Sequence, residues 1–410
     1  MKNIIKMSLA TAIMVSVGTL NAQAAEDGIS IFDNIKVKGE IRPRYEMVDE
    51  SNPKPNANAL TNRLMLGVNA DLFGTDWLST YVEMTDVHSL NNNYNGLDGK
   101  GQANSIVADP EQTRLTQSYL DLKYKKTLLR AGRQMVNLDN QRFIGAVGWR
   151  QMPQTFDAVA IVDNSIENLN FMAAYVTQVN TIFADGGPKT NSASTETVLL
   201  NAKYKVMDAL SVTGYGYLVE DFGDTYGLAL TGSPKISDGL TLNYRAEYAM
   251  LGDASFETSG TNTDNDADYM NVELGVNMSG ILAEVGYEVQ SGTSAGSTSN
   301  DTFSTPLGTN HGHNGWADLF LATPTEGLVD MDIMVGYKSK DLGLVKAIYH
   351  DFTSDVESID YGTELDLLYK RAIPGVNGLT GMLKYADYSA DDFGVDTQKF
   401  WAMLDYKFSN

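Results

Sequence analysis

The stretch IKVKGEIRPRYEM, residues 35–47, separates into two sets when every second residue is taken. The set that begins with Ile35 has no charged member, and the set that begins with Lys36 has only charged members. Side chains along a β-strand point alternately to opposite faces, so this strand has one apolar face and one ionic face. A soluble antiparallel sheet can also have two such faces, because its polar side can contact water. The stretch therefore predicts a strand, and the rest of the chain must decide what surrounds it.

The same alternation recurs along the chain in segments of about ten residues. The predicted strands are residues 35–47, 60–72, 77–85, 115–124, 128–134, 156–163, 169–179, 197–205, 210–218, 224–232, 240–250, 269–278, 281–290, 329–338, 344–352, 361–370, 379–388 and 398–408. Short turns alternate with longer loops rich in Gly, Asn, Asp and Ser, which is typical of transmembrane β-barrels. We expect an all-β, antiparallel up-and-down barrel of about 18 strands, with 16 as the alternative, short periplasmic turns and long extracellular loops. A stacked β-helix would instead show a fixed repeat length.

The first residues have the pattern of a targeting segment. Lys2 and Lys6 precede a short apolar run, and Ala22 and Ala24 provide the small residues that a signal peptidase reads. We expect residues 1–24 to be a signal peptide and residues 25–410 to be an outer-membrane barrel. The expected location is the cell outer membrane of a Gram-negative bacterium.

Bulk composition excludes several functions. The net charge of −22 argues against a nucleic-acid partner, because phosphate binding needs a basic surface. With no Cys and 4 His, the chain has no thiolate chemistry and few catalytic bases. No nucleophile motif surrounds His350, so we expect no enzyme and no cofactor. His311 and His313 are better explained by loop packing than by a metal, and the acidic run 264–268 lacks the Gly and distant Glu of an EF-hand.

Two features of individual strands carry further expectations. Pro43 cannot donate a hydrogen bond to a neighbouring strand, so we expect a bulge or a lost hydrogen bond there. The last predicted strand places apolar residues on its outward side and resembles the terminal strand that the barrel-assembly machinery recognises, although Ser409 and Asn410 follow the final aromatic residue.

Two loop stretches resemble a known family. GRQMVNLDNQRFIGAVGWRQMPQTFDA, residues 132–158, and NHGHNGWADLFLATPTEGLVD, residues 310–330, are similar to stretches of the alginate-export family of outer-membrane porins. The resemblance implies an 18-stranded monomeric barrel that carries an anionic polysaccharide or small solutes. It also implies a conduit lined by Arg and Lys, which Arg133, Arg142 and Arg150 would match.

If apolar residues face lipid, their neighbours along each strand line the lumen. The candidate basic lining residues are Lys36, Lys38, Arg42, Arg44, Arg63, Arg130, Arg133, Arg142, Arg150 and Arg245. The candidate acidic lining residues are Glu273, Glu284, Glu288, Glu364 and Asp366. Arg130 and Arg133 have opposite parity, so one of them needs a bulge or a loop position. We hypothesise that a basic wall faces an acidic wall; the alternative is a wide hydrated lumen whose charges neutralise one another.

Loops 136–155 and 291–327 contain apolar residues that are unusual in solvated loops. Phe143, Trp149, Trp316 and Phe320 are therefore candidates for an inward-folded constriction, with a sticky surface patch as the alternative. The predicted function is a porin for passive diffusion of small anionic solutes, such as carboxylates or uronate-type saccharides. Dedicated export of an alginate-like polysaccharide is one alternative, and a structural or adhesive barrel without transport is another.

Overall fold

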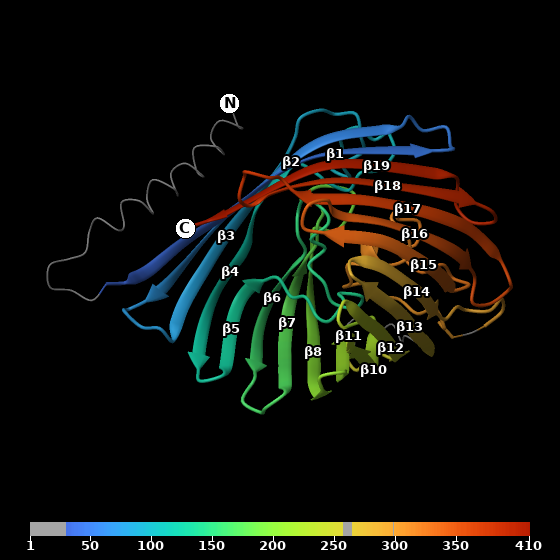
Figure 1. The fold of residues 1–410 in the computed structure, drawn as a ribbon. Coiled ribbons are helices and arrows are strands. Elements are labelled where there is room, and N and C mark those ends of the chain that lie inside the picture. Colours follow the sequence, from blue (N-terminus) through green and yellow to red (C-terminus); the bar gives the residue numbers. More distant parts are fainter. Residues whose placement is uncertain (1–29, 257–264, 298) are drawn as a thin grey trace.

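The computed structural model describes residues 30–256, 265–297 and 299–410. The predicted signal peptide lies outside the described residues, and so does the start of the acidic run 264–268. Antiparallel strands dominate the structure (Figure 1). The strands are β1 Phe32–Glu50, β2 Ala57–Leu72, β3 Leu78–Ser89, β4 Gln112–Tyr124, β5 Thr127–Gln134, β6 Thr155–Asp163, β7 Leu169–Asn180, β8 Ser192–Met207, β9 Leu210–Val219, β10 Gly223–Gly232, β11 Lys235–Ser237, β12 Leu240–Gly252, β13 Ala267–Met278, β14 Ile281–Gln290, β15 Leu328–Ser339, β16 Gly343–Thr353, β17 Asp360–Ala372, β18 Leu379–Ala390 and β19 Thr397–Ser409. A 3₁₀ turn, η1 Asn310–Gly312, lies in the connection before β15.

The sheet closes because β1 pairs with both β2 and β19. All 19 strands belong to one sheet, but β11 is a three-residue segment beside β12, and β10 pairs directly with β12. The wall of the barrel therefore has 18 strands. The expected fold class and the larger of the two expected strand counts are confirmed.

The strand register assigns each residue to the inner or outer surface. In β1, Arg44 and Glu46 are 1% exposed, whereas the neighbouring Ile41 is 40% exposed. The exposed large apolar side chains lie on the outward side of nearly every strand. Ionic residues inside and apolar residues outside are the arrangement of a barrel in a membrane. In the described part of the chain, no helix is long and apolar enough to cross a membrane.

Two local features match their residue types. Pairing between β1 and β19 is interrupted at Arg42 and Pro43 and resumes in the same register, so Pro43 causes a loss of pairing and no bulge. Ser279 and Gly280 join β13 to β14 with φ of 50° and 94°. A two-residue hairpin turn with both φ values positive has the backbone twist that suits flanking strands.

Candidate functional site

Three long connections enter the barrel and contact its inner wall. We call residues 90–111 the first inner loop, residues 135–154 the second and residues 291–327 the third. They join β3 to β4, β5 to β6 and β14 to β15, and coiled segments lie inside the barrel in Figure 1. Because all three loops pack inside the barrel, together they narrow the lumen.

Aromatic side chains attach the second inner loop to strands β9 and β13 and the third inner loop to strands β16 and β17. Phe143 packs at ring-centroid distances of 5.1 Å from Tyr215 and 5.3 Å from Tyr269. Phe320 packs 4.5 Å from Phe352 and 5.8 Å from Tyr361. Phe143 and Phe320 are 9% and 3% exposed, so each loop is anchored by an apolar cluster as well as by polar contacts.

The arginines of β1 and β2 hold the backbone of the second inner loop. Arg42 donates hydrogen bonds to the carbonyls of Gly148, Trp149 and Arg150. Arg44 donates to the Trp149 carbonyl at 2.6 Å and pairs with Asp109 of the first inner loop. These inward-facing guanidiniums therefore bind loop backbone, which would otherwise carry unsatisfied carbonyls inside the barrel.

Carboxylates neutralise the buried arginines. Arg63 pairs with Glu40 on the neighbouring strand, and Arg44 lies 3.3 Å from Glu46. The arginines of the second inner loop are also paired. Arg142 lies 2.6 Å from Glu288 of β14, and Arg150 lies 3.1 Å from Glu46 and 2.8 Å from Asp318 of the third inner loop.

Two of the predicted acidic residues, Glu364 and Asp366, lie on β17 and bind the third inner loop. Glu364 accepts a hydrogen bond of 2.7 Å from the backbone N–H of Ala317, and Asp366 accepts one of 3.1 Å from the N–H of Trp316. The acidic and basic sides of the lumen therefore meet through loops that bind both. The hypothesis that a basic wall faces an acidic wall across the lumen does not hold for these arginines, because carboxylates already pair with them.

Lys384 of β18 is enclosed by three tryptophans. Its Nζ lies 3.7 Å from the ring centroid of Trp316, 4.3 Å from Trp149 and 5.4 Å from Trp401. Trp149 also stacks on His311 at 4.3 Å with an interplanar angle of 8°. Contact between a cation and an aromatic face is strongest when both are removed from water, so this cluster joins the second and third inner loops to the wall.

His311 connects the enclosed lysine to a carboxylate. Its Nε2 lies 2.6 Å from Nζ of Lys384, and its Nδ1 lies 2.5 Å from Asp318. Burial lowers the pKa of His311 to about 3, and Lys384 acts in the same direction. A neutral imidazole in this position donates from Nδ1 and accepts at Nε2. Burial acts to raise the pKa of Asp318, but the hydrogen bond from His311 and the adjacent cations hold it well below its usual value.

The other predicted basic residues are Lys36, Lys38, Arg130, Arg245 and Arg133, and the first four face the lumen. Lys36 and Lys38 are exposed on the inward side of β1, with Lys38 4.5 Å from the ring of Tyr81. Arg130 and Arg245 also point inward, and they pair with Asp121 at 2.7 Å and with Glu247 at 2.5 Å. These four residues line the lumen between the inner loops and the end of the barrel where the strands are joined by short turns.

The prediction that Arg133 lines the pore is wrong. It pairs across the sheet with Ser118 and Asp157 and shares its side of β5 with the exposed Leu129, so it faces outward. Its guanidinium lies 2.7 Å from the Asp157 carboxylate. Arg130 and Arg133 do have opposite parity, as predicted, and no bulge in β5 brings them to the same face.

A cavity of about 380 Å³ lies in the lumen on the side of β8 to β14. Its charged lining includes Lys203, Arg245, Glu273 and Glu284. Groups of both signs therefore remain accessible to solute below the inner loops. In the described part of the chain, no group of three or more His, Asp and Glu is placed to hold a metal ion.

Sequence reasoning missed two parts of this site. The sequence predicts only a long polar loop over residues 86–113, yet Asp109 in this loop is fully buried, and Tyr94 and Val107 pack on the wall. The presence of Tyr94 and Val107 in a polar loop was the available signal. Lys384 was also missed, although its position on the polar side of the predicted strand 379–388 assigns it to the lumen.

Comparisons with known proteins agree with this architecture. The barrel is similar to the structure of OccAB2 from Acinetobacter baumannii, with a TM-score of 0.72 and 17% identity over 93% of this chain and 100% of that chain. OccAB3 from the same organism matches with a TM-score of 0.73 and 16% identity over 92% and 100%. The structure of Pseudomonas aeruginosa OpdK with vanillate matches with a TM-score of 0.68 and 13% identity over 93% and 100%.

No curated protein sequence matches the chain significantly. A family model described as alginate export matches residues 33–317, which is well over half of the chain. That match spans the barrel from β1 into the third inner loop and includes the first of the two stretches whose resemblance the sequence indicated. The chain belongs to the alginate export family.

Proposed function

We propose that this protein is an outer-membrane porin that lets small anionic solutes diffuse passively through its lumen. The observation that carries the proposal is a set of inward-facing lysines that form no ion pair with a carboxylate. Seven inner-wall lysines have no carboxylate within 4.0 Å in the described part of the chain: Lys36, Lys38, Lys123, Lys203, Lys338, Lys346 and Lys370. We call this set the mouth lysines.

The mouth lysines lie near one end of the barrel. Lys123 is the penultimate residue of β4, Lys338 is the penultimate residue of β15, and Lys370 is two residues from the end of β17. Each of these strands runs into a short turn, and short turns are expected on the periplasmic side. A ring of like charges on a pore wall raises the local concentration of the opposite ion. The net charge of −22 for the whole chain does not describe the potential along this path.

The inner loops support small solutes over a polymer. They are held by buried ion pairs and by two aromatic clusters, so a polysaccharide would have to displace several anchored contacts at once. Vanillate, found with OpdK, is a carboxylate, and a carboxylate would be attracted to a lysine-rich mouth.

We infer that the protein is a monomer. We also infer that the barrel-assembly machinery recognises its C-terminal strand β19 and inserts the barrel into the membrane.

Reversal potentials in planar bilayers across a KCl gradient test the proposal. We expect chloride to be preferred in the wild type. Changing Lys38, Lys203, Lys346 and Lys370 together to Gln should shift the reversal potential toward potassium.

A matched control changes four lysines outside the inner wall: Lys125, Lys126, Lys235 and Lys340. Their replacement by Gln removes the same net charge, but screening over about 8 Å at physiological salt should leave the selectivity near that of the wild type. Potassium selectivity in the wild type, or equal effects of the two four-lysine variants, would overturn the proposal.

A further inference from the structure

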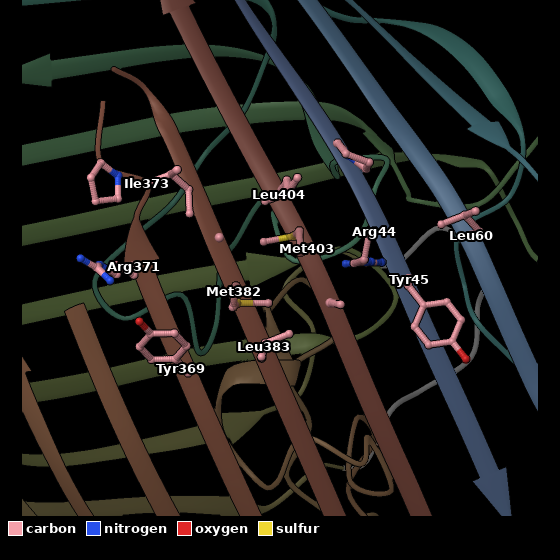
Figure 2. Close-up of a pocket in the computed structure, with 14 residues that line it drawn as sticks. Arg44, Tyr45, Leu60, Tyr369, Arg371, Ile373, Met382, Leu383, Met403 and Leu404 are labelled. Carbon is pink, nitrogen blue, oxygen red and sulfur yellow. The ribbon is translucent and has the colours of Figure 1, made fainter. Parts of the chain in front are cut away.

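The outer surface of the barrel carries an apolar groove that crosses five strands. Its volume is about 470 Å³, and it runs over β17, β18, β19, β1 and β2. Figure 2 shows Tyr369, Arg371 and Ile373 at one end and Tyr45 and Leu60 at the other. A site for a small ligand has about 300–1,000 Å³, so this groove is large enough to hold one extended chain.

Small residues form the floor of the groove. Gly381 pairs with Leu404, Ala402 pairs with Tyr45, and Pro43 lies beside them in β1. The larger Leu383 and Leu404 stand beside these positions on the same outward surface. A hydrocarbon chain can therefore lie against the backbone where the side chains are short, which increases its contact area with the protein.

One end of the groove has a cation without a partner. Arg371 is the residue before the last residue of β17, and it faces outward because it pairs with Gly381. The other nine arginines in the chain each donate a hydrogen bond to a carboxylate, amide or backbone oxygen; they are Arg42, Arg44, Arg63, Arg114, Arg130, Arg133, Arg142, Arg150 and Arg245. In the described part of the chain, Arg371 makes no such bond and has no carboxylate within 4.0 Å.

The position of Arg371 indicates which chemical group can bind at this end of the groove. β17 continues into the short turn 373–378, and short turns lie on the periplasmic side, where the headgroups of one leaflet are. A guanidinium binds a phosphate through two parallel hydrogen bonds. The site thus combines an apolar groove with a phosphate-binding group at the height of the headgroups.

We propose that the groove is a binding site for a single phospholipid of the periplasmic leaflet, with one acyl chain along the groove and its phosphodiester bound by Arg371. The positive charge of the unpaired guanidinium complements the negative charge of the phosphodiester. This inference does not depend on which solute crosses the lumen.

Native mass spectrometry of the full-length protein purified from membranes tests the proposal, with 1-palmitoyl-2-oleoyl-phosphatidylglycerol as the added lipid. We expect one retained lipid on each barrel. Arg371→Gln should lower retention at least about tenfold, because it removes the charge-assisted hydrogen bonds from the guanidinium to the phosphate. Arg371→Lys should recover part of the retention because it restores the positive charge.

Ala402→Phe should abolish retention by filling the floor of the groove. Its control is Ala246→Phe on the outward side of β12, and the control for the charge is Lys340→Gln in a neighbouring periplasmic turn. If Ala402→Phe does not fold, Arg371→Gln still tests the proposal, because it leaves the apolar residues of the barrel surface unchanged. Equal retention in all variants would mean unspecific annular lipid, and a dimer in place of the lipid adduct would mean that the groove binds a second copy of this chain; either result overturns the proposal.

Discussion

The arginines of β1, β2 and the second inner loop can be compared with the mouth lysines. Both sets are basic and both face the interior of the barrel, but their surroundings differ. Arg44 and Arg142 are 1% exposed and bound to carboxylates, whereas Lys36 and Lys203 are exposed and have none within 4.0 Å. The planar guanidinium can bind several oxygens at once and suits a buried contact between segments, while the strongly hydrated ammonium suits a wet surface. The arginines hold the inner loops in place, and the lysines are the cations that remain accessible in the proposed porin.

The largest expected effect comes from removing one of the buried arginines. Arg44→Ala leaves the buried Asp109 without its ion-pair partner and leaves Glu46 with Arg150 as its remaining cation. Removing one partner of a buried ion pair costs about 3–5 kcal/mol, and here the cost falls on the docking of the first and second inner loops. We expect a larger and noisier single-channel conductance than in the wild type. Lys38→Ala, on the same strand and face, should leave the conductance steady, and equal noise in the two variants would contradict the division of roles.

A smaller effect should follow from acidification. Burial lowers the pKa of both His311 and His313 to about 3, so both imidazoles are neutral when the third inner loop is docked. In an undocked loop they regain a pKa near 6.5 and bind protons more readily. Docking is therefore fully favourable above about pH 6.5 and weakens as the pH falls toward 3. At pH 5.5 the cost is at most about 3 kcal/mol for the two histidines together.

Single-channel recordings at pH 7.5 and pH 5.5 measure this effect. Opening events should become more frequent at the lower pH in the wild type. The double variant His311→Gln and His313→Gln lacks the two imidazoles of the third inner loop, so its opening frequency should respond less to pH than that of the wild type. A response of undiminished size in the double variant would assign the titration to another group.

The sequence was sufficient for the wall of the barrel because the wall depends on local alternation. Strand β12 shows this: Arg245 and Glu247 face inward and Tyr248 and Met250 outward, as their parity in the sequence requires. The sequence pattern does not predict in the same way which charged side chains are bound by other segments. Whether Arg42 is free or bound depends on carbonyls about a hundred residues later in the chain, and no periodicity relates the two segments.

The smallest expected effect compares two arginines that are three residues apart. Arg130 faces the lumen and pairs with Asp121, whereas Arg133 faces outward and pairs with Asp157. Arg130→Gln leaves an unpaired carboxylate on the pore wall, so it should shift the reversal potential toward potassium, by less than the four-lysine variant. Arg133→Gln should leave the reversal potential unchanged and cost about 0.2–1 kcal/mol of stability, as for other partly exposed ion pairs. A shift of equal size in both variants would mean that net charge near β5, and not the face on which it lies, controls the ion preference.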